Sequence, residues 1–173
     1  VFQPLLSMAT SQGLSDNEKS AACWTLYFVF GSNAPVTSEQ ASQVLTKMGD
    51  IVSDLALGEN LHTSATSTIE GIFNNYKITK SAQDVQLVFQ PLLSMATSQG
   101  LSDNERSAAC WTLYFVFGSY APVTSEQASQ ALLILSEIIN DATVSETIRM
   151  AATYPIRNIF SNGNIAKSAH DVQ

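Results

Sequence analysis

Residues 1–43 read VFQPLLSMATSQGLSDNEKSAACWTLYFVFGSNAPVTSEQASQ, and the same stretch returns as residues 88–130. Only two of the 43 positions differ: Lys19 becomes Arg106 and Asn33 becomes Tyr120. The offset of 87 residues continues to the end of the chain, where SAQDVQ (81–86) reappears as SAHDVQ (168–173). Because a fixed internal period is the signature of repeat architectures, the sequence predicts two copies of one module, 1–87 and 88–173.

Each module contains four segments with helical patterns. The clearest runs from Thr37 to Leu57, where Thr37 and Gln40 form a capping box and apolar residues follow at intervals of three and four. The other three lie, in the first copy, at about 61–76, 81–100 and 15–31. In the second copy Pro155 replaces Thr68, which predicts that the helix equivalent to 61–76 is shorter or kinked there.

The segment AACWTLYFVF (21–30) admits two interpretations. It is apolar almost all round, which is typical of a helix buried at the centre of a module. Its aromatic and β-branched residues also suit a strand. The capping box formed by Ser15 and Glu18 before it and Gly31 after it favour the helix.

The fold class expected from these patterns is all-α, a tandem repeat of two four-helix modules of about 86 residues. The linker GSNAPV (31–36) is short, so the modules should pack closely. As an alternative to 1 and 88, the structural modules could begin near residues 37 and 124. Val1 corresponds to Val88, which lies inside a predicted helix, and this predicts that the chain is a window on a longer array.

Composition narrows the classes of function. Charged residues make up 13% of the chain, against about 25% in typical domains. The net charge is −7, spread over both halves without a basic patch, which argues against nucleic acid and anionic membranes as partners. No apolar run is long enough to span a membrane. A weakly charged surface suits self-association, and an extracellular location is expected.

A search for chemistry in the sequence predicts no enzyme. No zinc-protease, serine-hydrolase, phosphate-loop, dinucleotide or EF-hand motif is present. The histidines, His62 and His170, do not repeat, because their counterparts are Arg149 and Gln83. We therefore predict no catalytic residue, no cofactor and no metal site.

The two cysteines occupy equivalent places, one in each module. Cys23 and Cys110 sit in apolar surroundings and lack a CxxC or Cys/His pattern, which favours buried thiols. A disulfide between the modules or a cross-link between chains is the alternative.

An aromatic cluster also repeats. Its members are Trp24, Tyr27 and Phe28 in the first copy and Trp111, Tyr114 and Phe115 in the second. Core packing explains such a cluster, and a pocket for an apolar ligand between helices is the functional alternative.

The halves diverge unevenly, and the differences suggest a contact. Residues 44–86 match their copies at 17 of 43 positions. Thr46 and Lys47 become Leu133 and Ile134, which widens the apolar face of one helix. We predict an assembly interface at Leu133 and Ile134, between modules or between chains.

These features favour a structural, self-assembling repeat protein. In composition the near-identical helical modules, rich in Ser, Thr, Gln and Ala, are similar to the repetitive units of secreted fibre proteins such as silks. That resemblance implies a longer secreted array that forms a fibre, matrix or filament, with further copies of the repeat as partners. The alternative is a helical binding protein for lipid or another small apolar ligand.

Overall fold

The computed structural model describes residues 2–32, 34–118 and 121–165, and all regular structure within these ranges is helical. The helices are α1 (Phe2–Ala9), α2 (Asp16–Gly31), α3 (Ser38–Ser53), α4 (Glu59–Asn74), α5 (Ala82–Thr97), α6 (Asp103–Gly118), α7 (Ser125–Asn140) and α8 (Glu146–Ser161). The predicted fold class, all-α with tandem helical repeats, is confirmed.

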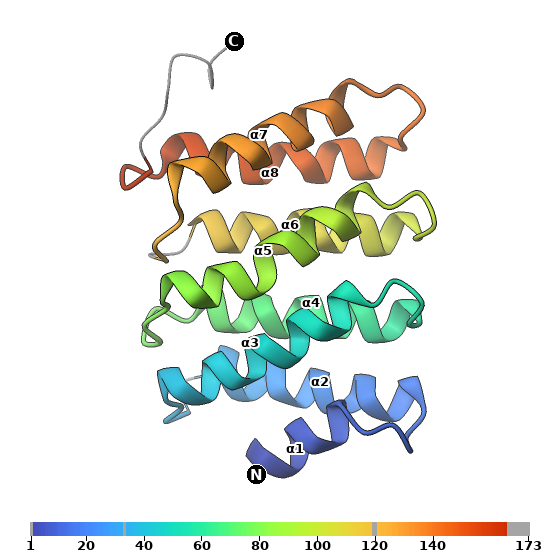
Figure 1. Cartoon of the computed structure of the whole chain (residues 1–173), viewed down its shortest axis with the longest axis vertical. Coiled ribbons are helices and arrows are strands. Elements are labelled where there is room, and N and C mark those ends of the chain that lie inside the picture. The colour runs from blue at the N-terminus through green and yellow to red at the C-terminus, as the bar shows by residue number, and fades with distance from the viewer. Residues whose placement is uncertain (1, 33, 119–120, 166–173) are drawn as a thin grey trace.

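The helices lie in two layers that face each other, and within each layer successive helices follow one another along the long axis of the molecule (Figure 1). The odd-numbered helices make one layer and the even-numbered helices the other. The even helices begin at Asp16, Glu59, Asp103 and Glu146, at intervals of 43 or 44 residues. The unit that repeats in space is therefore a pair of helices, and the 87-residue period of the sequence covers two successive pairs.

Helix starts lie where capping boxes predict them. The Thr37 hydroxyl accepts the N–H of Gln40 at 3.1 Å, and the Gln40 side chain accepts the N–H of Thr37 at 3.0 Å. The end of this helix differs from the prediction, since α3 stops at Ser53 instead of Leu57. The reason is that the carbonyl of Asp54, just after α3, accepts hydrogen bonds from the N–H of Leu57 and from the His62 ring.

Of two predictions about individual helices, the helical interpretation of residues 21–30 is confirmed and the shortening at Pro155 is not. The segment AACWTLYFVF is helical in both copies, as α2 and α6, so the strand alternative is wrong. For the helix that contains Pro155 we expected shortening or a kink. The shortening is wrong, because α8 has the same 16 residues as α4, and the kink stays a prediction. Pro155 is buried within α8, where a proline removes one backbone hydrogen bond of the helix.

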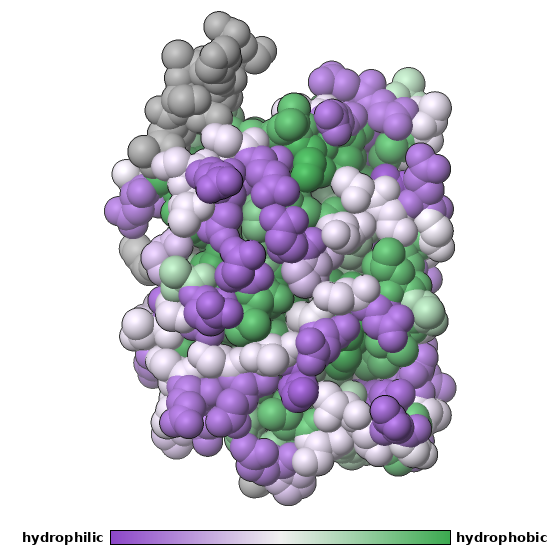
Figure 2. Space-filling model, viewed as in Figure 1, coloured by the Kyte–Doolittle hydropathy of each residue, from purple (hydrophilic) through white to green (hydrophobic). Residues whose placement is uncertain are grey.

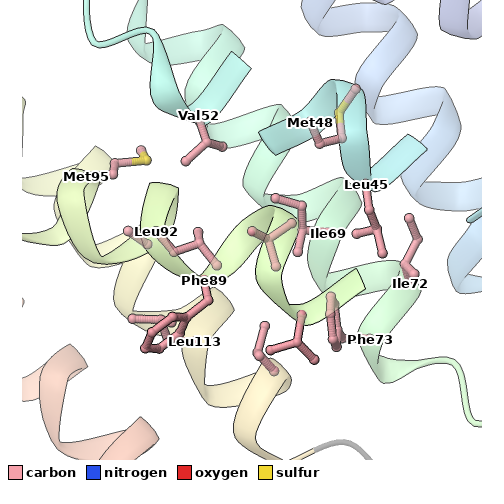
Figure 3. Close-up of a cluster of buried hydrophobic side chains, with 14 of the residues drawn as sticks. Leu45, Met48, Val52, Ile69, Ile72, Phe73, Phe89, Leu92, Met95 and Leu113 are labelled. Carbon is pink, nitrogen blue, oxygen red and sulfur yellow. The ribbon is translucent and has the colours of Figure 1, made fainter. Parts of the chain in front are cut away.

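One hydrophobic core runs through the stack. Figure 3 shows its central part, where side chains of α3 and α4 meet those of α5 and α6. The labelled side chains are Leu45, Met48, Val52, Ile69, Ile72, Phe73, Phe89, Leu92, Met95 and Leu113, and each is at most 2% exposed. Because the core crosses from each pair to the next, every pair depends on its neighbours for burial.

The even helices approach one another closely. A Cβ on Gly71 of α4 would lie 3.0 Å from Cδ2 and 3.1 Å from the carbonyl oxygen of Tyr27 on α2, so a larger residue here would require a small shift of Tyr27. The equivalent residue in α8 is Asn158, whose side-chain amide donates to the carbonyl of Tyr114 at 2.8 Å. The contact between neighbouring even helices therefore differs between the two copies: the backbones of α2 and α4 approach closely, whereas α6 and α8 are joined by a hydrogen bond.

Candidate functional site

The 87-residue period allows one side chain to be compared inside the stack and at its end. Phe73 on α4 is 2% exposed, but its counterpart Phe160 on α8 is 41% exposed. Met95 on α5 is fully buried, whereas its counterpart Met8 on α1 is 36% exposed. Both ends of the stack therefore present apolar side chains that a neighbouring helix pair covers in the interior.

The tryptophans behave differently and serve as a reference. Trp24 on α2 is 43% exposed and Trp111 on α6 is 39% exposed, so their exposure does not depend on position in the stack. The prediction of a fully buried central helix is wrong on this face. Its aromatic residues gave the segment an apolar pattern all round, although only the opposite face, with Cys23 and Leu26, is buried in the core.

The structure divides the predicted aromatic pocket among separate places. Trp24, Tyr27 and Phe28 contact one another on α2, and Phe28 is 66% exposed. Trp111 keeps an edge contact with Tyr114 on α6 and also stacks on Tyr154 of α8, with ring centroids 4.2 Å apart. Sequence reasoning missed Tyr154, because its counterpart in the first copy is Ser67 and the residue has no repeat signal.

Tyr114 and Phe115 line a groove of about 500 Å³ across the C-terminal ends of α4, α6 and α8. Its lining is mixed, with aromatic rings, asparagine amides and one lysine. The residues are Phe73, Asn74, Tyr76, Lys80, Tyr114, Phe115, Gly118, Asn158, Ser161, Asn162, Gly163 and Asn164. Burial lowers the pKa of Lys80 to about 8, and its ammonium donates to the carbonyl of Asn75. The groove can therefore offer both hydrogen bonds and aromatic surfaces to a ligand.

Cys23 and Cys110 are free and buried, on α2 and α6, with α4 between these helices. The alternative of a disulfide between them is not what the structure forms. Burial raises the pKa of Cys23 to about 11 and that of Cys110 to about 12. Both thiols are thus kept protonated and shielded, which is typical of structural cysteines.

Leu133 and Ile134 lie on α7 and are not equally accessible. Leu133 is 63% exposed, whereas Ile134 is half-buried against the core. Figure 2, seen from the side of the odd helices, shows polar and apolar residues mixed over this face, with an apolar area over α7. Of the predicted pair, Leu133 is the residue with a side chain available for a contact.

A buried hydrogen bond joins the two copies of the module. His62 on α4 and Glu105 on α6 are both buried, with Nδ1 of His62 2.6 Å from Oε1 of Glu105. Hydrogen bonds from His62 and Ser102 hold the pKa of Glu105 below its usual value, against the effect of burial. Sequence analysis found His62 but not this role, because its partner lies 43 residues away and the capping box around Glu105 gives no sign of a second contact.

Two further searches concern the described part of the chain. It holds no group of three or more His, Cys, Asp or Glu side chains placed to bind a metal ion. None of its helices combines the length and the apolar character needed to cross a bilayer. The predicted His170 lies outside the described residues.

Comparison with known proteins shows a likeness of fold. No protein-family model and no curated protein matches the sequence. Among solved structures, an engineered protein superposes on 95% of this chain with a TM-score of 0.66 at 11% identity. A designed armadillo repeat protein in complex with the peptide (KR)4 does so over 93% with a TM-score of 0.64 at 20% identity. A second, computationally designed armadillo repeat protein for modular peptide recognition matches over 93% with a TM-score of 0.60 at 18% identity.

The chain spans about 64% of the length of the engineered protein and about 65% of each designed armadillo protein. At these identities the likeness establishes an architecture of stacked helical repeats.

Proposed function

We propose that this chain is a structural repeat scaffold that lengthens by end-to-end association with further copies of itself. The observation that carries the proposal is the contrast between equivalent positions. Phe160 and Met8 are 41% and 36% exposed at the two ends, while Phe73 and Met95 are 2% and 0% exposed inside. A surface that repeats an interior contact is already shaped for another copy of the same unit.

The geometry of such an association predicts its product. One end of the stack would meet the opposite end of the next copy, so the interface is heterologous and every addition leaves a new free end. Open-ended addition builds filaments, in agreement with a fibre or matrix role. An extracellular location and the absence of catalytic activity belong to the same proposal.

Sedimentation analysis of the 173-residue chain over a wide concentration range tests the proposal. The average mass should rise above the 18.7 kDa of one chain as concentration increases. Replacing Met8 and Phe160 by serine should suppress the rise. Trp24→Ser is the matched control, because the exposure of Trp24 does not depend on its place in the stack. A chain that stays monomeric at millimolar concentration would disprove the proposal.

Lateral contact through α7 would be a different mode of association. Leu133 is the exposed residue for it, and Leu133→Thr combined with Ile134→Lys removes the apolar extension found only in the second copy. If this double variant prevents association while Met8→Ser and Phe160→Ser do not, the contact is lateral and the end-to-end mode is wrong.

A second candidate function is binding of an extended peptide or an apolar ligand in the groove at the ends of α4, α6 and α8. The volume of about 500 Å³ and the mixed lining favour it, and the net charge of −7 favours a basic ligand. One similar fold belongs to a designed protein in complex with the peptide (KR)4.

Calorimetric titration with (KR)4, with an acidic peptide of equal length and with a fatty acid separates these ligands. Saturable heat with (KR)4 alone, lost in Tyr76→Ser but kept in Leu133→Ser, would support peptide binding. Both residues are strongly exposed, at 78% and 63%, so neither variant should disturb the core. The absence of saturable heat with all three ligands would remove this candidate.

A further inference from the structure

We propose that copies of this chain join head to tail through an ion pair between Arg149 of one copy and Glu18 of the next. This pair would replace, at the joint between chains, the contact that His62 and Glu105 make inside the chain. The inference rests on the proposed end-to-end association and adds to it the direction and the register of the joint.

The internal contact provides the template. Nδ1 of His62 lies 2.6 Å from Oε1 of Glu105, and Nε2 of His62 lies 3.0 Å from the carbonyl oxygen of Asp54. Both neighbours are acceptors, because the lowered pKa of Glu105 keeps it a carboxylate. Nδ1 of His62 therefore donates a hydrogen bond to a buried carboxylate.

Glu105 performs two tasks with its two oxygens. Oε1 accepts from His62, while Oε2 accepts the backbone N–H of Ser102 at 2.8 Å and caps the start of α6. Glu18 occupies the same position in α2. Its Oε2 caps Ser15 at 2.8 Å, but within the described residues its Oε1 has no partner, and the residue is exposed. The acceptor that an incoming copy would use is therefore free at the α2 end.

Arg149 occupies the position of His62 at the other end. The helices α4 and α8 are 16 residues long and their bounds are offset by 87, so the two positions lie on the same helix face. Arg149 is partly buried, and within the described residues its side chain makes no direct hydrogen bond or ion pair. Hydrogen bonds from Thr143, and to a smaller extent the charges of Arg106 and Arg149, lower the pKa of Asp141. Arginine therefore stands in the second copy at the position where the first copy has the hydrogen-bond donor His62.

The neighbouring positions are compatible with this register. Inside the chain, Asn104 donates to Glu59 at 2.9 Å. The equivalent residues at a joint would be Asn17 of the incoming copy and Glu146 on α8, which are again an amide donor and a carboxylate. Two hydrogen-bonded contacts therefore carry over with their donors and acceptors on the same sides.

The substitution of arginine for histidine also gives the joint a direction. Arg149 stays charged at every physiological pH and can donate two hydrogen bonds to one carboxylate. If the α8 ends of two chains met, Arg149 and Arg157 of one chain would face the same residues of the other. If two α2 ends met, Glu18 of one chain would face Glu18 of the other. Like charges disfavour both arrangements, so addition should proceed in one direction only.

Charge reversal tests the joint. Arg149→Glu makes a chain acidic at both contact positions, and Glu18→Lys makes one basic at both. Each variant alone should associate at least about tenfold more weakly than the parent chain. An equimolar mixture should recover association, because each end then finds an opposite charge. Lys47→Glu is the control for altered net charge, since Lys47 is exposed on α3.

A second variant separates charge from folding. Glu18→Gln keeps a capping side chain at the start of α2 but removes the negative charge, so it should retain the fold and still weaken association. Parent chains that associate while the single variants and the mixture all behave like Lys47→Glu would overturn this joint and leave the end-to-end proposal in place. Parent chains that stay monomeric would overturn both.

Discussion

Replacement of Phe73 or Phe160 by alanine measures how much stability a helix pair receives from its neighbour. The two residues occupy equivalent positions on α4 and α8, so helix propensity and local sequence position contribute equally to both variants. They differ in burial, at 2% exposed for Phe73 and 41% for Phe160. A difference between the variants therefore reports the contact with the following pair.

The expected magnitudes follow from burial. Removing a fully buried phenylalanine costs about 3–5 kcal/mol, which combines lost transfer free energy with the cavity left behind. Phe160 keeps roughly three-fifths of its surface buried, and water can fill the space that its removal leaves. We expect Phe160→Ala to cost about 1–2 kcal/mol, which is about 2–3 kcal/mol less than Phe73→Ala.

Urea denaturation followed by tryptophan fluorescence measures both values at low protein concentration. Equal losses in the free energy of unfolding would refute the idea that neighbour contact sets the burial of this position. A repeat at high concentration extends the test to assembly. There the Phe160 variant should lose more stability than in dilute solution, because association would bury its side chain in the parent chain.

The remaining predictions concern buried polar groups, each measured by denaturation. Ser20 donates to the backbone of α4 at 2.9 Å, whereas the Ser107 hydroxyl is buried without a partner among the described residues. Ser20→Ala should therefore lower the free energy of unfolding by about 1 kcal/mol, and Ser107→Ala should leave it unchanged or raise it. His62→Ala should cost about 1–3 kcal/mol, because the buried Glu105 carboxylate then keeps only its hydrogen bond from Ser102. An unchanged free energy of unfolding would show that the contact between His62 and Glu105 does not stabilise the fold. Burial raises the pKa of Glu70 to about 7, so between pH 4.5 and 7 the folded chain holds a proton that the unfolded chain has released. The free energy of unfolding should therefore fall as pH rises through this range, by at most about 3 kcal/mol. Glu70→Gln should remove that part of the pH dependence, and an unchanged pH profile would show that Glu70 ionises freely.

Local signals in the sequence predicted most of the helices. Capping pairs such as Thr37 with Gln40 act over three residues, so their hydrogen bonds can be anticipated without knowing the fold. The end of α3 could not be predicted in the same way. It depends on the Asp54 carbonyl, which accepts a hydrogen bond from the ring of His62 on the next helix.

The candidate sites were less predictable than the helices. Sequence patterns drew attention to Trp111 and Tyr114, which contact each other, but not to Tyr154, 43 residues away, on which Trp111 stacks. The apolar pattern of α2 indicated burial on all sides, although one face carries the exposed Trp24. Hydrophobicity alone does not tell which apolar face the neighbouring helices cover.

The sequence by itself determined that this protein is a helical repeat, because a period of 87 residues and the helix caps are properties of the chain read locally. The tertiary structure decided what each copy of a residue does. Glu105 is buried against His62, while Oε1 of the equivalent Glu18 has no partner among the residues that the structure describes. Identical side chains differ because burial depends on whether another helix pair lies beside them, and that neighbour is supplied by the fold and not by the residue.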